Sequence, residues 1–234
     1  MCSANSLRIT FLPTRPKRST KSSTPPAIIK PIDASRLKTY PLQRRHSKVQ
    51  VSNFAKVWTK GRSFKRFLDS LPDILAVKTL REVAQAIAKA HRRGRPVIVG
   101  MGAHVVKVGL GPLLVDLMER GIVTALAMNG AVIIHDFELA FMGHTSEEVD
   151  AEIDSGRFGM AEETGRMLNE AITLGMKEGL GLGESLGLYI NRHKHQFPNR
   201  ATSLLATGAR LGLPVTVHVA VGTDIIHMHP SADG

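Results

Sequence analysis

The sequence contains very little cysteine and lacks a long uninterrupted apolar run. Its single cysteine, Cys2, excludes an internal disulfide and a cysteine-rich metal site. A chain without disulfides suits a reducing compartment, so we expect a cytoplasmic protein. The best apolar run is interrupted by Asn129, His135 and Asp136, and we therefore expect neither a bilayer span nor a membrane partner.

Acidic residues are scarce in the first part of the chain. Residues 1–66 hold 16 Lys and Arg but a single acid, Asp33, whereas residues 67–234 hold 15 basic and 19 acidic residues. The net charge of +11 therefore comes from the leader, while the body is mildly acidic. This distribution argues against a nucleic-acid-binding core, and no nucleic-acid partner is expected.

The leader is predicted to be disordered over residues 1–48. It is rich in Ser, Thr, Pro, Arg and Lys, and such a composition cannot bury enough apolar surface to fold. Two interpretations remain, an organellar transit peptide and a start without a role. The prolines oppose the amphipathic helix of a transit peptide and favour the second. The basic cluster 44–48 is interpreted as solvated surface and receives no function.

Residues 49–234 are long enough for one sizeable core, since the chain has 43% hydrophobic residues. The spacing of apolar residues, together with Gly and Pro at the ends of segments, predicts three strands that alternate with helices. We expect an α/β fold, with an open parallel sheet flanked by helices in a Rossmann-like arrangement. The expected strands are 97–99, 122–128 and 215–221. The expected helices are 63–70, 75–93, 109–121, 131 onward, 146–156, 158–179, one that carries Leu186, Leu188, Tyr189 and Ile190, and 199–212.

The loop after the first predicted strand carries Gly100 and Gly102. This spacing resembles the start of a dinucleotide fingerprint, but the third expected glycine is Val105. The two glycines let backbone N–H groups approach an anion, and a helix beginning near Gly109 would point its positive end to the same space. Glycines required only for a tight turn explain this loop equally well.

The second predicted strand leads into Asn129 and Gly130, a strong turn pair. On a helix that begins near Ala131, His135 and Glu138 share a face, while the next residue, Asp136, is turned by about 100 degrees. The histidine and Glu138 could form an acid/base pair, a ligand site or a plain ion pair. We favour a functional role for His135 and Asp136, and a capping or surface role for Glu138.

The third predicted strand ends in a polar segment that holds Asp224, His227 and His229. Such a group can bind a divalent metal, relay protons or hold an ammonium group. No helical pair of ligands and no fourth ligand is present, so substrate or cofactor roles for Asp224 and His229 are favoured over metal. His218 is interpreted as a core histidine.

Two acidic segments in the middle of the chain are predicted to belong to helix starts. Residues 145–148, Thr-Ser-Glu-Glu, match a capping box. Glu162 and Glu163 could face a cationic substrate, but such a pair more often stabilises the positive end of a helix.

From Pro96 onward the arrangement resembles deoxyhypusine synthase and its bacterial relatives. The resemblance rests on Gly102–Leu110, on Ala127–Asp136 and on Gly222–His229. It implies an NAD-dependent transferase that oxidises spermidine and moves its aminobutyl group to a lysine. It also implies a homo-oligomer, a tetramer in the family.

The resemblance implies roles for individual residues. Asp224 would pair with a substrate ammonium, helped by Asp136 and His227, and His135 or His229 would be the catalytic base. The residues implied to contact NAD are Gly102, Ala103, His104, Asn129, Gly130, Ala131, Gly222 and Thr223.

Two departures from the family weaken the expected activity. Ile134 and His135 stand where the family has paired glutamates, and no residue matches its covalent lysine. We therefore expect either a C-terminally truncated fragment or a chain that has lost the transfer step. The alternatives are a non-catalytic nucleotide-binding or assembly module and a metal-dependent hydrolase that uses Asp224, His227 and His229.

Overall fold

The computed structural model describes residues 32–233. Contacts within the chain define two units, residues 1–48 and residues 49–234. In the first unit the described residues are exposed and form two short 3₁₀ turns, Ala34–Arg36 and Leu42–Arg44. The leader predictions for residues 1–31 lie outside the described residues. Among the helices of residues 32–233, none combines the length and apolarity needed to cross a membrane.

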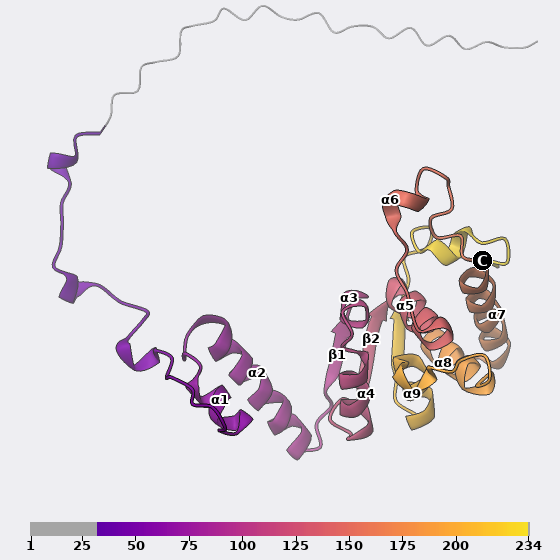
Figure 1. The fold of residues 1–234 in the computed structure, drawn as a ribbon, viewed down its shortest axis with the longest axis horizontal. Helices are drawn as coiled ribbons and strands as arrows, with labels where there is room; N and C mark the ends of the chain where they lie inside the picture. The colour runs from indigo at the N-terminus through magenta and orange to yellow at the C-terminus, as the bar shows by residue number, and fades with distance from the viewer. Residues whose placement is uncertain (1–31, 234) are drawn as a thin grey trace, which may run out of the picture. The chain divides into compact units, whose positions relative to one another are not determined.

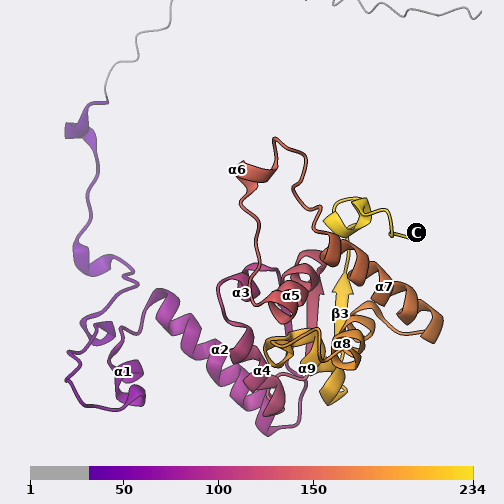
Figure 2. The same cartoon turned by 45° about the vertical axis from the view of Figure 1, so that its right-hand side comes forward.

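The second unit contains a small open parallel sheet of three strands in the order β1-β2-β3. These strands are β1 (Ile98–Met101), β2 (Ala125–Asn129) and β3 (Val215–His218) (Figures 1 and 2). The α/β class with an open parallel sheet flanked by helices is thus confirmed. β3 ends earlier than predicted because the backbone N–H groups of Thr223 and Asp224 donate to the Ala220 carbonyl and form a turn.

Helices flank and follow the strands. Ser63 caps the first helix as predicted, since its hydroxyl accepts from the Arg66 N–H. The second helix ends within one residue of its predicted end. The helices are α1 (Phe64–Ser70), α2 (Leu75–Arg92), α3 (His104–Lys107), α4 (Gly111–Glu119), α5 (Gly130–Met142), α6 (Val149–Glu152), α7 (Glu162–Glu178), α8 (Leu182–Arg192) and α9 (Leu204–Leu211).

Three helix predictions were wrong in extent: α7 begins at Glu162 rather than at 158, α9 begins at Leu204 rather than at 199, and α6 is far shorter than predicted. The predicted helix 109–121 is, by contrast, confirmed as α4, which begins two residues late because Gly109 adopts a left-handed φ of +83° between α3 and α4. The predicted helix 146–156 shrinks to α6, whose N-cap is Glu148, without a side-chain capping bond. Ser146 has a left-handed φ of +73°, and this turns the chain before a longer helix can form.

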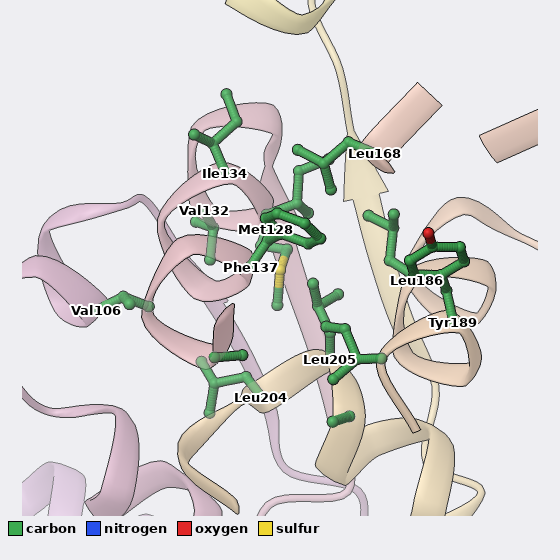
Figure 3. Close-up of a cluster of buried hydrophobic side chains, with 14 of the residues drawn as sticks. Val106, Met128, Val132, Ile134, Phe137, Leu168, Leu186, Tyr189, Leu204 and Leu205 are labelled. Carbon is green, nitrogen blue, oxygen red and sulfur yellow. The ribbon is translucent and has the colours of Figure 1, made fainter. Parts of the chain in front are cut away.

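The core lies on one face of the sheet, where α5, α8 and α9 contact the strands. Figure 3 shows Phe137 of α5, Leu186 of α8 and Leu205 of α9 converging near Met128 of β2. Each such side chain contributes roughly 1.5–3 kcal/mol when it is fully buried. Close packing requires glycine at Gly183, where an added Cβ would lie 2.1 Å from a strand carbonyl oxygen.

Asp136 is the buried charge within this core and joins α5 to α9. Its carboxylate accepts from the Ser203 hydroxyl at 2.6 Å and from the backbone N–H groups of Leu204 and Leu205 at 2.8 and 3.2 Å. Burial raises the pKa of Asp136, and these three donors act against that shift. The carboxylate thereby satisfies N–H groups at the start of α9 that have no partner within the helix.

We predict that Asp136→Ala lowers the free energy of unfolding by about 3 kcal/mol, because it leaves buried donors without partners. The matched control is Asp116→Ala on α4, whose carboxylate is exposed and pairs with Arg120. That variant is expected to change stability by less than about 0.5 kcal/mol. Urea denaturation measures both, and equal losses would contradict this role for Asp136.

Candidate functional site

The loops that follow the three parallel strands meet at one edge of the sheet. A Cβ built on Gly102, just after β1, would lie 4.0 Å from Nδ2 of Asn129 at the end of β2. Asn129 also caps α5, since its side-chain oxygen accepts from the Val132 N–H at 3.3 Å. Gly130, which follows it, lies against Asp224 from the loop after β3. The structure therefore brings the three predicted segments together.

The contact between Gly130 and Asp224 depends on glycine. A Cβ at position 130 would lie 2.1 Å from Oδ2 of Asp224 and 2.6 Å from Oδ1. The same Oδ2 accepts from the Ala220 N–H at 3.1 Å, which fixes the carboxylate. A negative charge at the start of a helix is favourable by itself. Asp224 is thus held at the start of α5, where it stabilises the helix and also lines a cavity.

A chain of hydrogen bonds connects His135 to Glu138. The Thr145 hydroxyl donates to Glu138 and lies 2.6 Å from Nδ1 of His135. Thr164 donates to the other oxygen of the same carboxylate at 3.0 Å. Because the single hydroxyl proton of Thr145 goes to Glu138, its oxygen accepts from His135, which assigns the proton to Nδ1. Nε2 of the neutral ring then carries the free lone pair.

The environment of His135 favours its neutral form. Burial lowers the pKa of His135, and the nearby Glu138 carboxylate acts in the opposite direction. Lys107 and His104, which lie on α3, lower the pKa further through charge repulsion. The net effect is a pKa below the ordinary 6.5, so the imidazole is uncharged at neutral pH.

Two adjoining cavities open beside this chain of hydrogen bonds. The first cavity has a volume of about 200 Å³ and includes Ala131, His135, Glu138, Thr223 and Asp224 in its lining. The second cavity has a volume of about 390 Å³ and is lined in part by Thr145, Glu163 and Thr164. Glu138, Ser146 and Glu147 line both cavities, so the two cavities adjoin.

The lining of both cavities is acidic. Asp224, Glu138 and Glu147 line the first cavity, and Glu138, Glu147 and Glu163 line the second. Glu147 is fixed by the Gly159 N–H, which lies 3.0 Å from one carboxylate oxygen. The residues that line these two cavities include no Lys or Arg. Such a lining attracts a cation.

Three predicted site residues lie away from these cavities. The Asp136 carboxylate is directed into the core, as described above. His229 packs on Gly165 of α7, with Nε2 at 3.1 Å from Glu162 and Nδ1 at 2.7 Å from Ser231. His227 has a buried Nδ1 without a hydrogen-bond partner in the described chain. Of the two histidines expected to act as a base, only His135 lines a cavity with Asp224.

The residues expected to contact a cofactor divide into two sets. Ala131 and Thr223 line the first cavity. Gly102, Ala103, His104, Asn129, Gly130 and Gly222 belong to the same edge of the sheet but line neither of the two cavities. Within residues 32–233 no three His, Cys, Asp or Glu side chains form a group able to hold a metal ion. The metal arrangement of Asp224, His227 and His229 is therefore absent from the described chain.

Sequence reasoning missed four residues of the site. Glu138 was interpreted as surface or capping, although its spacing from His135 was the correct signal. Thr145 matched a capping box, yet its hydroxyl donates to Glu138. Glu147 and Glu163 line the cavities although both belong to segments interpreted as helix starts.

No family model matches this sequence, and no curated protein matches it.

The lowered pKa of His135 predicts a pH-dependent stability. Because the unfolded histidine binds a proton more readily than the folded one, stability is lost as the pH falls through 6.5. His135→Gln should lose less unfolding free energy than the native chain between about pH 7.5 and about pH 5.5. His195→Gln, at an exposed position, should behave like the native chain. Urea titrations at several pH values measure how the free energy of unfolding changes with pH. If His135→Gln shows the same pH dependence as the native chain, a buried neutral His135 is contradicted.

Proposed function

We propose that this chain is a deoxyhypusine synthase-like protein that binds a polyamine or a related amine in the two adjoining cavities. With NAD it would oxidise the amine and transfer its aminoalkyl group, as the resemblance implies. The observation that supports this proposal most directly is the pairing of an acidic, Lys- and Arg-free lining with a neutral imidazole. The open parallel sheet with glycine loops at its carboxyl edge supports a Rossmann-like arrangement.

The distribution of carboxylates suits a linear cation with separated charges. Asp224 belongs to the first cavity alone and Glu163 to the second alone, while Glu138 and Glu147 line both. One ammonium group would pair with Asp224, and a second would lie near the other carboxylates. Apolar residues complete the walls and suit the methylene chain between the charges, namely Ile134, Phe158 and Ile225 in the first cavity and Phe141 and Met142 in the second.

His135 supplies the proton acceptor in this proposal. An amine must be neutral before its neighbouring carbon can lose a hydride, so the ammonium proton has to leave first. The lone pair of Nε2 takes that proton, and the ring becomes an imidazolium with both nitrogens protonated. Glu138 stabilises this cation through Thr145, which keeps its hydrogen bonds to both groups. In this proposal, the paired glutamates that the family has at positions 134 and 135 are replaced by His135 and by Glu138, which Thr145 connects through hydrogen bonds.

The cofactor part of the proposal rests on the loops at the sheet edge. Apart from Asn129, no atom lies within 4 Å of a Cβ built on Gly102, and none does at Gly222. Exposed glycine backbone of this kind fits the close approach of a pyrophosphate. The residues that would hold NAD are Gly102, Ala103, His104, Asn129, Gly130, Ala131, Gly222 and Thr223. When bound, NAD would accept the hydride from the amine carbon.

A non-catalytic nucleotide-binding or assembly module is the second candidate function. It is favoured by the position of Asp224 at the start of α5, since stabilising the helix explains that carboxylate without any ligand. The acidic lining of the second cavity is not explained by this alternative. A metal-dependent hydrolase has no support from the described side chains, because Asp224, His227 and His229 form no metal-binding group.

We predict that Asp224→Asn weakens the binding of spermidine about tenfold or more, because it removes one charge-assisted hydrogen bond. Asp116→Asn, at an exposed position on α4, should leave the affinity unchanged. Isothermal titration calorimetry at low salt measures both, with the thermal midpoint as a check of folding. Equal affinities for the native chain and Asp224→Asn would contradict the binding of an ammonium group by Asp224 in the first cavity.

NAD at about millimolar concentration should raise the thermal midpoint of the native chain, because a ligand that binds only the folded state stabilises it. Gly102→Leu should reduce this shift, since its side chain would fill the open space beside the backbone. The variant should keep its affinity for spermidine, which is bound elsewhere. If spermidine binds but NAD does not raise the thermal midpoint, the amine site is supported and the NAD site is contradicted.

A further inference from the structure

One face of the parallel sheet is uncovered. Gly100 of β1, Ala127 of β2 and Thr216 of β3 lie side by side in register on this face, and the first and last are exposed. Ile98 lies two residues before Gly100 on the same face, and 64% of it is exposed. The helices contact the opposite face, where Leu126 is buried. Parallel sheets are almost always covered on both faces, so this open sheet face lacks a partner.

A second exposed apolar surface lies on α2. Leu80, Val83 and Ile87 follow one another at helical spacing and are exposed by 58, 50 and 37%. The polar residues of α2, Gln85 among them, lie on the other side of the helix. At its end, Nδ1 of His91 lies 3.1 Å from the Gly121 carbonyl oxygen. Each side chain of the apolar row is more than a third exposed.

The segments that carry the two surfaces have opposite net charges. Residues 56–95, which include α1 and α2, hold 11 Lys and Arg and three acids. Residues 96–234, which include the sheet, hold nine Lys and Arg and 16 acids. A basic amphipathic helix and an acidic body with an open sheet face are therefore complementary in both apolar surface and charge. Each copy of the chain carries one of each.

We propose that α2 of one copy covers the open sheet face of a second copy, and that the reverse contact completes a two-fold dimer. The missing side chain at Gly100 and the small one at Ala127 let a helix approach the sheet closely, and Ile98 meets the apolar row of α2. An exchange of this kind is self-complementary, as a two-fold interface requires. The contact involves no residue of the amine cavities and stands independently of the proposed function.

The solution mass tests this dimer. The native chain should have twice the 25.4 kDa mass of one chain in sedimentation equilibrium at about 20 µM. Val83→Asp should be monomeric, because it places a charge in the apolar contact. Gln85→Asp introduces the same charge on the polar side of α2 and should remain dimeric. Added salt should shift the native chain toward monomer, because screening weakens the attraction between opposite charges.

Mixing two variants tests whether the helix meets the sheet of another copy. Ala127→Arg should also be monomeric, with circular dichroism to confirm that it is folded. A tagged Val83→Asp chain keeps an intact sheet face and should capture Ala127→Arg, which keeps an intact helix, but not a second Val83→Asp chain. A monomeric native chain would overturn the proposal, as would a dimeric Val83→Asp chain. Two monomeric variants that fail to capture each other would also overturn it.

Discussion

The contact between the Asp224 carboxylate and the first turn of α5 is the constraint on which the site depends. It places a residue from the loop after β3 against the residue that follows β2, and glycine at position 130 is what leaves room for it. Asp224 thereby lines the first cavity, whereas Glu163 lines only the second. The carboxylate is favourable there even without a ligand, so the cavity is organised before anything binds.

The second organising element is the use of buried hydrogen bonds in two opposite ways. Around Asp136 every donor comes from the start of α9, and the carboxylate serves the fold alone. Around Glu138 the donors are two threonine hydroxyls, and one of them connects the carboxylate to an imidazole that lines a cavity. Two acids separated by one residue on the same helix thus have different roles, which their partners determine.

The features that depend on local sequence pattern were predicted correctly. The side-chain roles that depend on partners far away in the sequence were not. The strands, α2 and the Ser63 cap follow from periodicity and capping preference, and the meeting of the three loops follows from parallel strand order. The role of Asp136 depends on Ser203, which is 67 residues away and was not foreseeable from α5 alone. Likewise, His229 is close to Asp224 in sequence, but its ring is hydrogen-bonded to Glu162 of α7 instead.

The helix α5 carries its apolar and polar residues in an order that tolerates no change of length. Ile133, Asp136 and Phe137 are buried, while His135 and Glu138 reach the cavity between and beside them. Each residue added or removed in a helix turns everything beyond it by about 100 degrees. A single-codon deletion between Gly130 and His135 would therefore send the imidazole toward the core and a core residue toward the cavity. A substitution within α5 keeps this arrangement of faces, whereas an insertion or deletion keeps it only at the two ends of the helix.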